Sequence, residues 1–303
     1  MMIAYKVKGH LAAFSTNLIF GLNMPVTAIL LTGWVTPMGY TISRVLFAAC
    51  LFWIVSLFRE NERVNGRDLG IIALGGFLGF IVSQFLYAES LMNTTVVCYS
   101  LIAAMGPVIV MLLAALFLKE PISVMKCSGV ALGVSGALLL IFNSGVAGGH
   151  NNVTGILLAI ASNTAYACYI IITRSVTQRY SPVTIMKWLF LFTSIMLVPF
   201  GLGDLPNQPV YSSNTTWQAV SMMTFVLIGA TALSYFLIPY ALQRLRATTV
   251  SIYMNLQPIV ASMVAIWLGQ DNLTWDKPIA LVLVISGALI VTHSPAKQQS
   301  MST

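Results

Sequence analysis

The chain has 303 residues, of which 58% are hydrophobic and 8% are charged, and its formal net charge is +7. A soluble domain carries about 25% charged residues, so this composition excludes an ordinary soluble protein and predicts a chain that lies mostly in lipid. The basic residues form no stripe interleaved with aromatic residues, so no nucleic-acid partner is expected.

Ten apolar segments follow one another along the chain, most of them close to the roughly 20 residues that a spanning helix needs. They cover residues 11–31, 37–58, 70–91, 95–118, 123–142, 154–176, 183–203, 217–242, 247–269 and 278–293. The first is longer than the core of a cleavable signal peptide, so we expect it to be retained as a span. The sequence therefore predicts an all-α integral membrane protein with ten transmembrane helices.

The basic residues between these spans indicate an orientation. With a cytoplasmic N-terminus, twelve Lys and Arg residues fall on the inner side and only Lys277 falls on the outer side. Because Lys and Arg are retained on the cytoplasmic side, both termini are expected to be cytoplasmic. The predicted location is a plasma membrane, the inner membrane in a bacterium.

The four cysteines, Cys50, Cys98, Cys127 and Cys168, lie singly in apolar runs and include no C-x-x-C pair. This spacing favours small core residues over a disulfide or a metal site. No cofactor or metal is predicted.

A repeat divides the chain into two parts. The tetrapeptide Ser-Gly-Ala-Leu occurs at 135–138 and at 286–289, an offset of 151 residues, and the same offset aligns Pro107 with Pro258 and Lys126 with Lys277. We predict five-helix repeats at 11–143 and 153–293, followed by a cytoplasmic tail at 294–303. Because five is odd, the second repeat must be inverted relative to the first, which is the arrangement of many secondary transporters.

Three stretches carry a resemblance to a known family. They are FGLNMPV in the first span, YTISRVLFA in the second, and PVIVMLLAALFLKEP with its later counterpart NLQPIVASMVAIWLGQD. The chain resembles the EamA-type branch of the drug/metabolite transporter superfamily, although Asp271 stands where the family usually has Glu. The resemblance implies ten helices, a central cavity between the repeats, and transport of small metabolites, commonly outward.

Two charged residues in the spans are candidates for a functional role, because charges in the membrane are costly. Arg44 lies near the outer end of the second span and Glu89 near the outer end of the third. One interpretation is a mutual ion pair that stabilises the bundle. The other is that Glu89 binds a substrate cation or carries a coupling proton.

Two prolines occupy matching places in the fourth and ninth spans. Pro107 and Pro258 each remove a backbone hydrogen bond, so we predict a helix kink at both positions. The kink is either an inherited shape or a bend that makes room for a cavity.

Uncharged polar and aromatic residues in mid-span are the candidates for binding substrate. Alone, each is more often a contact between helices than a ligand, but together they lie in the spans that line the cavity of the resembled family. The predicted substrate-binding residues are Asn17, Asn23, Gln84, Tyr99, Tyr166, Tyr169, Tyr235, Tyr253 and Asn255, with Ser100, Asn163 and Gln257 beside them.

The predicted function is a secondary transporter, an exporter of small metabolites such as amino acids or related amphiphilic or cationic compounds. The chain has no P-loop for ATP-driven transport and no constellation of catalytic residues for an enzyme. A membrane-embedded enzyme, a channel and a scaffold remain the alternatives. The expected partners are a small-molecule substrate and the lipid bilayer, and the expected state is a monomer or a homodimer.

Overall fold

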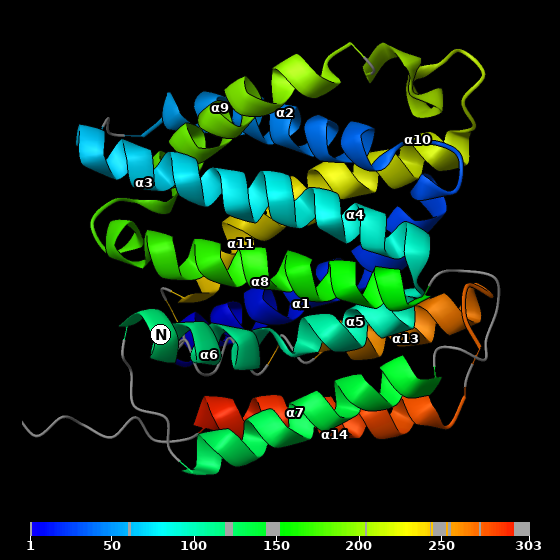
Figure 1. Ribbon diagram of the computed structural model, residues 1–303. Coiled ribbons are helices and arrows are strands. Elements are labelled where there is room, and N and C mark those ends of the chain that lie inside the picture. The colour runs from blue at the N-terminus through cyan, green and yellow to red at the C-terminus, as the bar shows by residue number, and fades with distance from the viewer. Residues whose placement is uncertain are drawn as a thin grey trace, which may run out of the picture.

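A computed structural model describes residues 2–59, 62–118, 124–143, 152–203, 205–242, 244, 253, 256–272 and 274–293. Every regular element in these residues is a helix. The helices lie side by side in one bundle, with α7 and α14 along one edge and α2 and α9 along the opposite edge (Figure 1).

The helices of the first half of the chain follow the predicted spans. They are α1 (Met2–Leu31), α2 (Pro37–Ser56), α3 (Gly66–Gly76), the π-helix η1 (Phe77–Val82), α4 (Ser83–Asn93), α5 (Val96–Ala104), α6 (Gly106–Leu118) and α7 (Val124–Asn143). The elements α3, η1 and α4 continue one another and together occupy the third predicted span.

The helices of the second half continue the same order. They are α8 (Asn152–Thr177), α9 (Pro182–Gly201), the 3-10 turns η2 (Leu205–Asn207) and η3 (Pro209–Tyr211), α10 (Trp217–Thr224), the π-helix η4 (Phe225–Leu233), α11 (Ser234–Leu242), α13 (Leu256–Trp267) and α14 (Asp276–His293). Part of the ninth predicted span lies outside the described residues.

Six helical stretches are long and apolar enough to cross a membrane: residues 7–31, 37–56, 66–93, 153–177, 182–201 and 217–237. The fourth predicted span is divided because α5 ends at Ala104 and α6 begins at Gly106. In the fifth span α7 runs from Val124 to Asn143, with a shorter apolar stretch at 127–136, and the described apolar helix of the ninth span is 256–267. The chain is an all-helical integral membrane protein.

The second and seventh spans begin with the same local structure. Thr36 caps α2 by accepting a hydrogen bond from the Gly39 N–H, and Ser181 caps α9 by accepting one from the Thr184 N–H. A proline follows each cap, at the first helical position, where its missing N–H leaves no hydrogen bond unmade. These caps align the two helices residue by residue, with Thr36 matched to Ser181.

The third and eighth spans share a rarer feature. Each is interrupted by a π-helix, η1 at Phe77–Val82 and η4 at Phe225–Leu233. The offset of 151 residues that aligns the two Ser-Gly-Ala-Leu sequences places η1 inside η4. π-Helices are rare and frequently lie at functional sites, so a matched pair directs attention to the helices around them.

The two Ser-Gly-Ala-Leu segments lie on α7 and α14, which pack closely against each other. A Cβ on Gly287 would lie 2.5 Å from the carbonyl oxygen of Gly129 and 2.7 Å from the backbone nitrogen of Gly133. The glycine therefore permits contact between the two backbones, as small residues do in membrane bundles.

Candidate functional site

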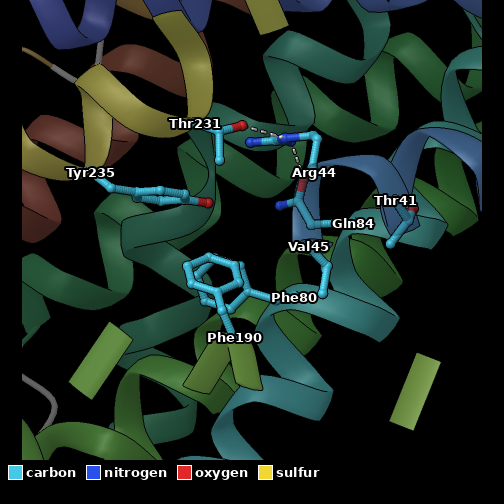
Figure 2. A pocket seen from close by; sticks show the side chains of 8 residues that line it. All are labelled: Thr41, Arg44, Val45, Phe80, Gln84, Phe190, Thr231 and Tyr235. Atoms are coloured by element: carbon cyan, nitrogen blue, oxygen red, sulfur yellow. Dashed lines mark hydrogen bonds between the residues drawn. The ribbon is translucent and has the colours of Figure 1, made fainter. Parts of the chain in front are cut away.

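A small pocket lies in the interior between the two halves of the chain. Its walls come from α2, η1 and α4 in the first half and from α9, η4 and α11 in the second (Figure 2). The lining residues are Thr41, Arg44, Val45, Phe80, Gln84, Phe190, Thr231 and Tyr235. In this conformation the pocket has room for about one water molecule.

Arg44 supplies the charge of this pocket, and its side chain is buried, with 7% of its surface exposed. Its Nε donates to Thr231 Oγ1 at 3.0 Å, and its Nη1 donates to Gln84 Oε1 at 2.6 Å. Both contacts are visible in Figure 2. A buried guanidinium needs such partners because removing it from water is costly.

A second group of polar side chains continues from Arg44 into α1. Arg44 Nη1 also donates to the hydroxyl of Tyr40 at 3.2 Å, and the same hydroxyl lies 3.1 Å from Thr27 Oγ1. The Asn23 amide donates to Tyr40 at 3.4 Å and to Tyr87 at 3.5 Å. Three helices, α1, α2 and α4, are thus joined by buried polar contacts beside the pocket.

Aromatic rings form the other side of the pocket. The rings of Phe80 and Phe190 meet edge to face with centroids 4.9 Å apart, and Tyr235 contacts both rings at 5.7 and 5.8 Å. Figure 2 shows the two phenylalanines opposite Arg44 and Thr231, with the Tyr235 hydroxyl pointing into the pocket. The pocket is therefore amphipathic, with hydrogen-bond donors on one wall and apolar rings on the other.

Equivalent positions of the two halves meet in this pocket. The offset of 151 residues pairs Phe80 with Thr231 and Gln84 with Tyr235, and all four residues line it. When α2 and α9 are aligned by their caps, Val45 corresponds to Phe190, and the position that corresponds to Arg44 is a leucine. The pocket is therefore symmetric in position but not in chemistry, because the cation comes from the first half alone.

One of the two interpretations of Arg44 and Glu89, a mutual ion pair, is not found in the structure. Arg44 bonds to Thr231, Gln84 and Tyr40, and among the described residues the carboxylate of Glu89 has no ion-pair or hydrogen-bond partner. Glu89 is half-buried in α4, five residues after Gln84, which turns it to a different face of the helix from the pocket.

Asn17, Gln257 and Tyr253 lie outside the pocket lining and form other hydrogen bonds. Asn17 accepts a hydrogen bond from Gln257 Nε2 at 2.7 Å, which joins α1 to α13. Tyr253 bonds to His10 at 3.0 Å, and Asn255 lies outside the described residues.

The other predicted tyrosines pack near the pocket without lining it. Tyr99 meets the ring of Tyr87 edge to face at 4.8 Å, and Tyr169 meets Phe80 in the same way at 5.4 Å. Tyr166 lies 5.5 Å from Tyr169, measured between ring centroids, and 37% of its surface is exposed. Of the predicted substrate-binding residues, Gln84 and Tyr235 line the pocket, and Asn23 lies beside it.

The two prolines lie close to helix starts. Pro107 is the second residue of α6, directly after the break at Met105, and Pro258 is buried as the third residue of α13. The side chain of Pro107 and the residues just before α13 lie outside the described part of the chain.

Four important residues were absent from the predicted set. Thr231, Phe80 and Phe190 look like ordinary apolar-span residues in the sequence, and Tyr40 lies in the first turn of α2. The repeat could have identified two of them. The offset of 151 residues pairs the predicted Gln84 with the predicted Tyr235, and one helical turn earlier it pairs Phe80 with Thr231.

Contacts between the halves close the end of the bundle that holds Asp68. Arg179 forms an ion pair with the Asp68 carboxylate at 3.0 Å, and the Tyr180 hydroxyl donates to the same oxygen at 2.9 Å. Glu62 accepts hydrogen bonds from the N–H and the hydroxyl of Ser181 at 2.9 and 3.1 Å. The start of α3 is thus bound to the link between α8 and α9.

These contacts change the acidity of Glu62. Partial burial opposes its ionisation, but hydrogen bonds from Ser181 and Thr184 and the charge of Lys187 outweigh that effect. The pKa of Glu62 therefore lies below its usual value.

The opposite end of the bundle is closed by uncharged contacts. Gln208 is buried, and its Oε1 accepts a hydrogen bond from the Thr36 N–H at 2.7 Å. The Val210 N–H donates to the Trp34 carbonyl at 2.9 Å, and Tyr211 donates to Ser43 at 2.7 Å. The link between α9 and α10 therefore covers the start of α2.

Comparisons with known proteins agree with this architecture. The profile of the EamA-like transporter family matches the chain twice, at residues 7–142 and 153–293. An uncharacterized transporter of Archaeoglobus fulgidus is 26% identical over 86% of this chain and 90% of its own length. A probable terminal-alkyne amino-acid exporter of Streptantibioticus cattleyicolor is 27% identical over 84% of each chain.

A solved crystal structure has a similar fold. Its TM-score is 0.62 at 18% sequence identity, and the match covers 93% of this chain and 95% of the other. This likeness concerns the fold alone.

Proposed function

Because this chain belongs to the EamA-like transporter family, we propose that it is a secondary transporter that exports small metabolites such as amino acids across the plasma membrane. We propose further that both termini are cytoplasmic and that the protein acts as a monomer or a homodimer. The observation that carries the proposal is the pocket between the halves, lined by equivalent positions of each.

We infer that the fold is two inverted five-helix repeats, 11–143 and 153–293. The packing of the bundle supports this, because exchanging each span for its counterpart in the other half reproduces the main contacts. For example, α1 packs against α11 and η4, and the counterpart α8 packs against α4 and η1. A pocket on the axis between such repeats is where alternating access requires the substrate site to be.

The transport step follows from the closure of both ends. The pocket has room for about one water molecule, so a metabolite enters only when the halves separate at one end. The contacts of Asp68 and Glu62 with the second half, and those of Gln208 with α2, are then the contacts that break in turn. We propose that Gln84, Tyr235 and Arg44 contact the substrate, that Asn23 and the neighbouring tyrosines support the site, and that Glu89 carries a coupling proton.

The test is counterflow in proteoliposomes loaded with a panel of amino acids. A carrier gives saturable uptake that an internal substrate accelerates, and Thr231→Val in the pocket should reduce this uptake. Linear, unsaturable flux would identify a channel, and chemical conversion of the labelled compound would identify an enzyme. Either of these results would refute the proposal.

A further inference from the structure

The guanidinium of Arg44 is a buried cation whose described partners are all neutral. They are Thr231, Gln84 and Tyr40. Two acids are described in the helical stretch 66–93: Asp68, at its start, forms an ion pair with Arg179, and Glu89 makes no ion pair with Arg44. The positive charge of the pocket is therefore uncompensated within the described protein, which is costly at this depth in a membrane.

Arg44 also has N–H donors that bond to none of the described residues. A guanidinium has five N–H groups. The described contacts use Nε and Nη1, and Nη2 donates to none of the described residues. Arg44 lines the pocket, and 7% of its surface remains exposed. Arg44 therefore has two N–H groups available to a molecule in the pocket.

A second donor faces the same space. The Tyr235 hydroxyl points into the pocket (Figure 2), and none of the described residues forms a hydrogen bond with it. Tyr235 comes from the second half of the chain and Arg44 from the first. An anion between them would bond to both halves and would neutralise the buried charge.

The opposite wall of the pocket indicates the chemistry of the ligand's side chain. Phe80 and Phe190 present apolar ring surface across from Arg44, and the pocket lining contains no acid that would bind an ammonium group. Accepting the proposed transport function, we propose that Arg44 and Tyr235 bind the carboxylate of the transported metabolite while its apolar side chain packs on Phe80 and Phe190. The ligand class is a small monocarboxylate with an apolar or aromatic side chain, and an amino group is not required.

Binding to the purified protein in nanodiscs tests this assignment without transport. The probes are matched pairs at millimolar concentration: L-phenylalanine with L-phenylalaninamide, and 3-phenylpropionate with 3-phenylpropionamide. We expect both carboxylates to raise the unfolding temperature and to bind roughly 10- to 100-fold more tightly than their amides. Equal binding of acids and amides, binding matched by chloride at the same concentration, or no binding of either acid overturns the assignment.

Variants locate the carboxylate. Arg44→Lys keeps the charge but loses the planar fork, so it should weaken 3-phenylpropionate binding roughly 10-fold or more. Tyr235→Phe removes only the unbonded hydroxyl and keeps the ring, so it should fold normally and weaken binding roughly threefold to tenfold. Tyr240→Phe, the same change on the same helix but outside the pocket lining, should leave the affinity unchanged. Unaltered binding in Tyr235→Phe and Arg44→Lys would refute the assignment.

Counterflow of the same probes separates this inference from the transport function. Binding of the acids that depends on Arg44, without any counterflow, would refute transport and leave the carboxylate site standing. Counterflow of the amides that is equal to that of the acids would support transport and refute the carboxylate site.

Discussion

Arg44 on α2 donates its Nε–H to Thr231 on the π-helix η4, at 3.0 Å, and this hydrogen bond joins the two halves of the chain inside the bundle. Thr231 accepts this bond and also donates its own hydroxyl proton to the Val226 carbonyl at 3.0 Å. One hydroxyl thus holds the cation and satisfies a backbone carbonyl of the π-helix.

The first prediction concerns that hydroxyl. Thr231→Val keeps the shape of the side chain but leaves a buried, charged donor without its partner. We expect a loss of about 1–3 kcal/mol of stability, seen as a lower unfolding temperature in detergent. Thr164→Val in α8 is the control, because the hydroxyl of Thr164 bonds only to the Ile160 carbonyl of its own helix. Equal stability of the two variants would show that the Arg44–Thr231 bond contributes nothing.

The second prediction concerns the contact between α7 and α14. Gly287→Ala should destabilise the protein by about 1–3 kcal/mol, because the new methyl group would lie 2.5 Å from the Gly129 oxygen. Gly133→Ala is the matched control, since its Cβ would meet only Val108 and Met105 at 3.6 and 3.7 Å, which is an ordinary contact. Thermal unfolding of both variants checks this, and a greater loss in Gly133→Ala would contradict the packing of the pair.

The sequence predicted the architecture better than the site. Apolar length identified the helices, and the repeat identified which segments correspond, because both signals are local or periodic. The sequence predicted a kink at Pro107 but not that α5 and α6 would be separate helices, and it did not reveal that π-helices would interrupt the third and eighth spans.

The residues of the pocket show the same limit. Polarity in mid-span selected Gln84 and Tyr235, which line the pocket. It also selected Asn17 and Tyr253, which form hydrogen bonds elsewhere, with Gln257 and His10. The ion pair of Arg44 and Glu89 was one of two interpretations, and it rested on their similar depth. Depth says nothing about the helix face, and Arg44 bonds instead to Tyr40, to Gln84 and to a threonine 187 residues away.

The third prediction is a pH dependence at the Asp68 end of the bundle. The pKa of Glu62 is lower in the folded protein than its unfolded value of about 4.3, so its ionised form stabilises the fold above that pH. This contribution is lost as the pH falls through the lower, folded pKa. Glu62→Gln should therefore have a lower unfolding temperature than the parent at neutral pH.

Lowering the pH should make that difference shrink until the two proteins unfold alike. Ser181→Ala removes one of the hydroxyl donors to Glu62 and also the cap of α9, so it should be less stable than the parent at every pH, by an amount that shrinks only in part as the pH falls. Thr177→Ala, whose hydroxyl bonds only to the Arg174 carbonyl, should follow the parent at every pH. A difference between Glu62→Gln and the parent that grows as the pH falls would contradict the lowered pKa.

The fourth prediction concerns coupling to protons. Glu89 is a half-buried acid in a span, and its carboxylate has no partner among the described residues, so it is a candidate for proton coupling. Glu89→Gln should abolish transport driven by a pH gradient in proteoliposomes while substrate exchange without a gradient continues. The two readouts separate loss of coupling from loss of folding, because a misfolded variant fails in both. Glu89→Asp retains a carboxylate and should keep some response to the gradient, and a Glu89→Gln variant that responds like the parent would assign the coupling proton to another group or to none.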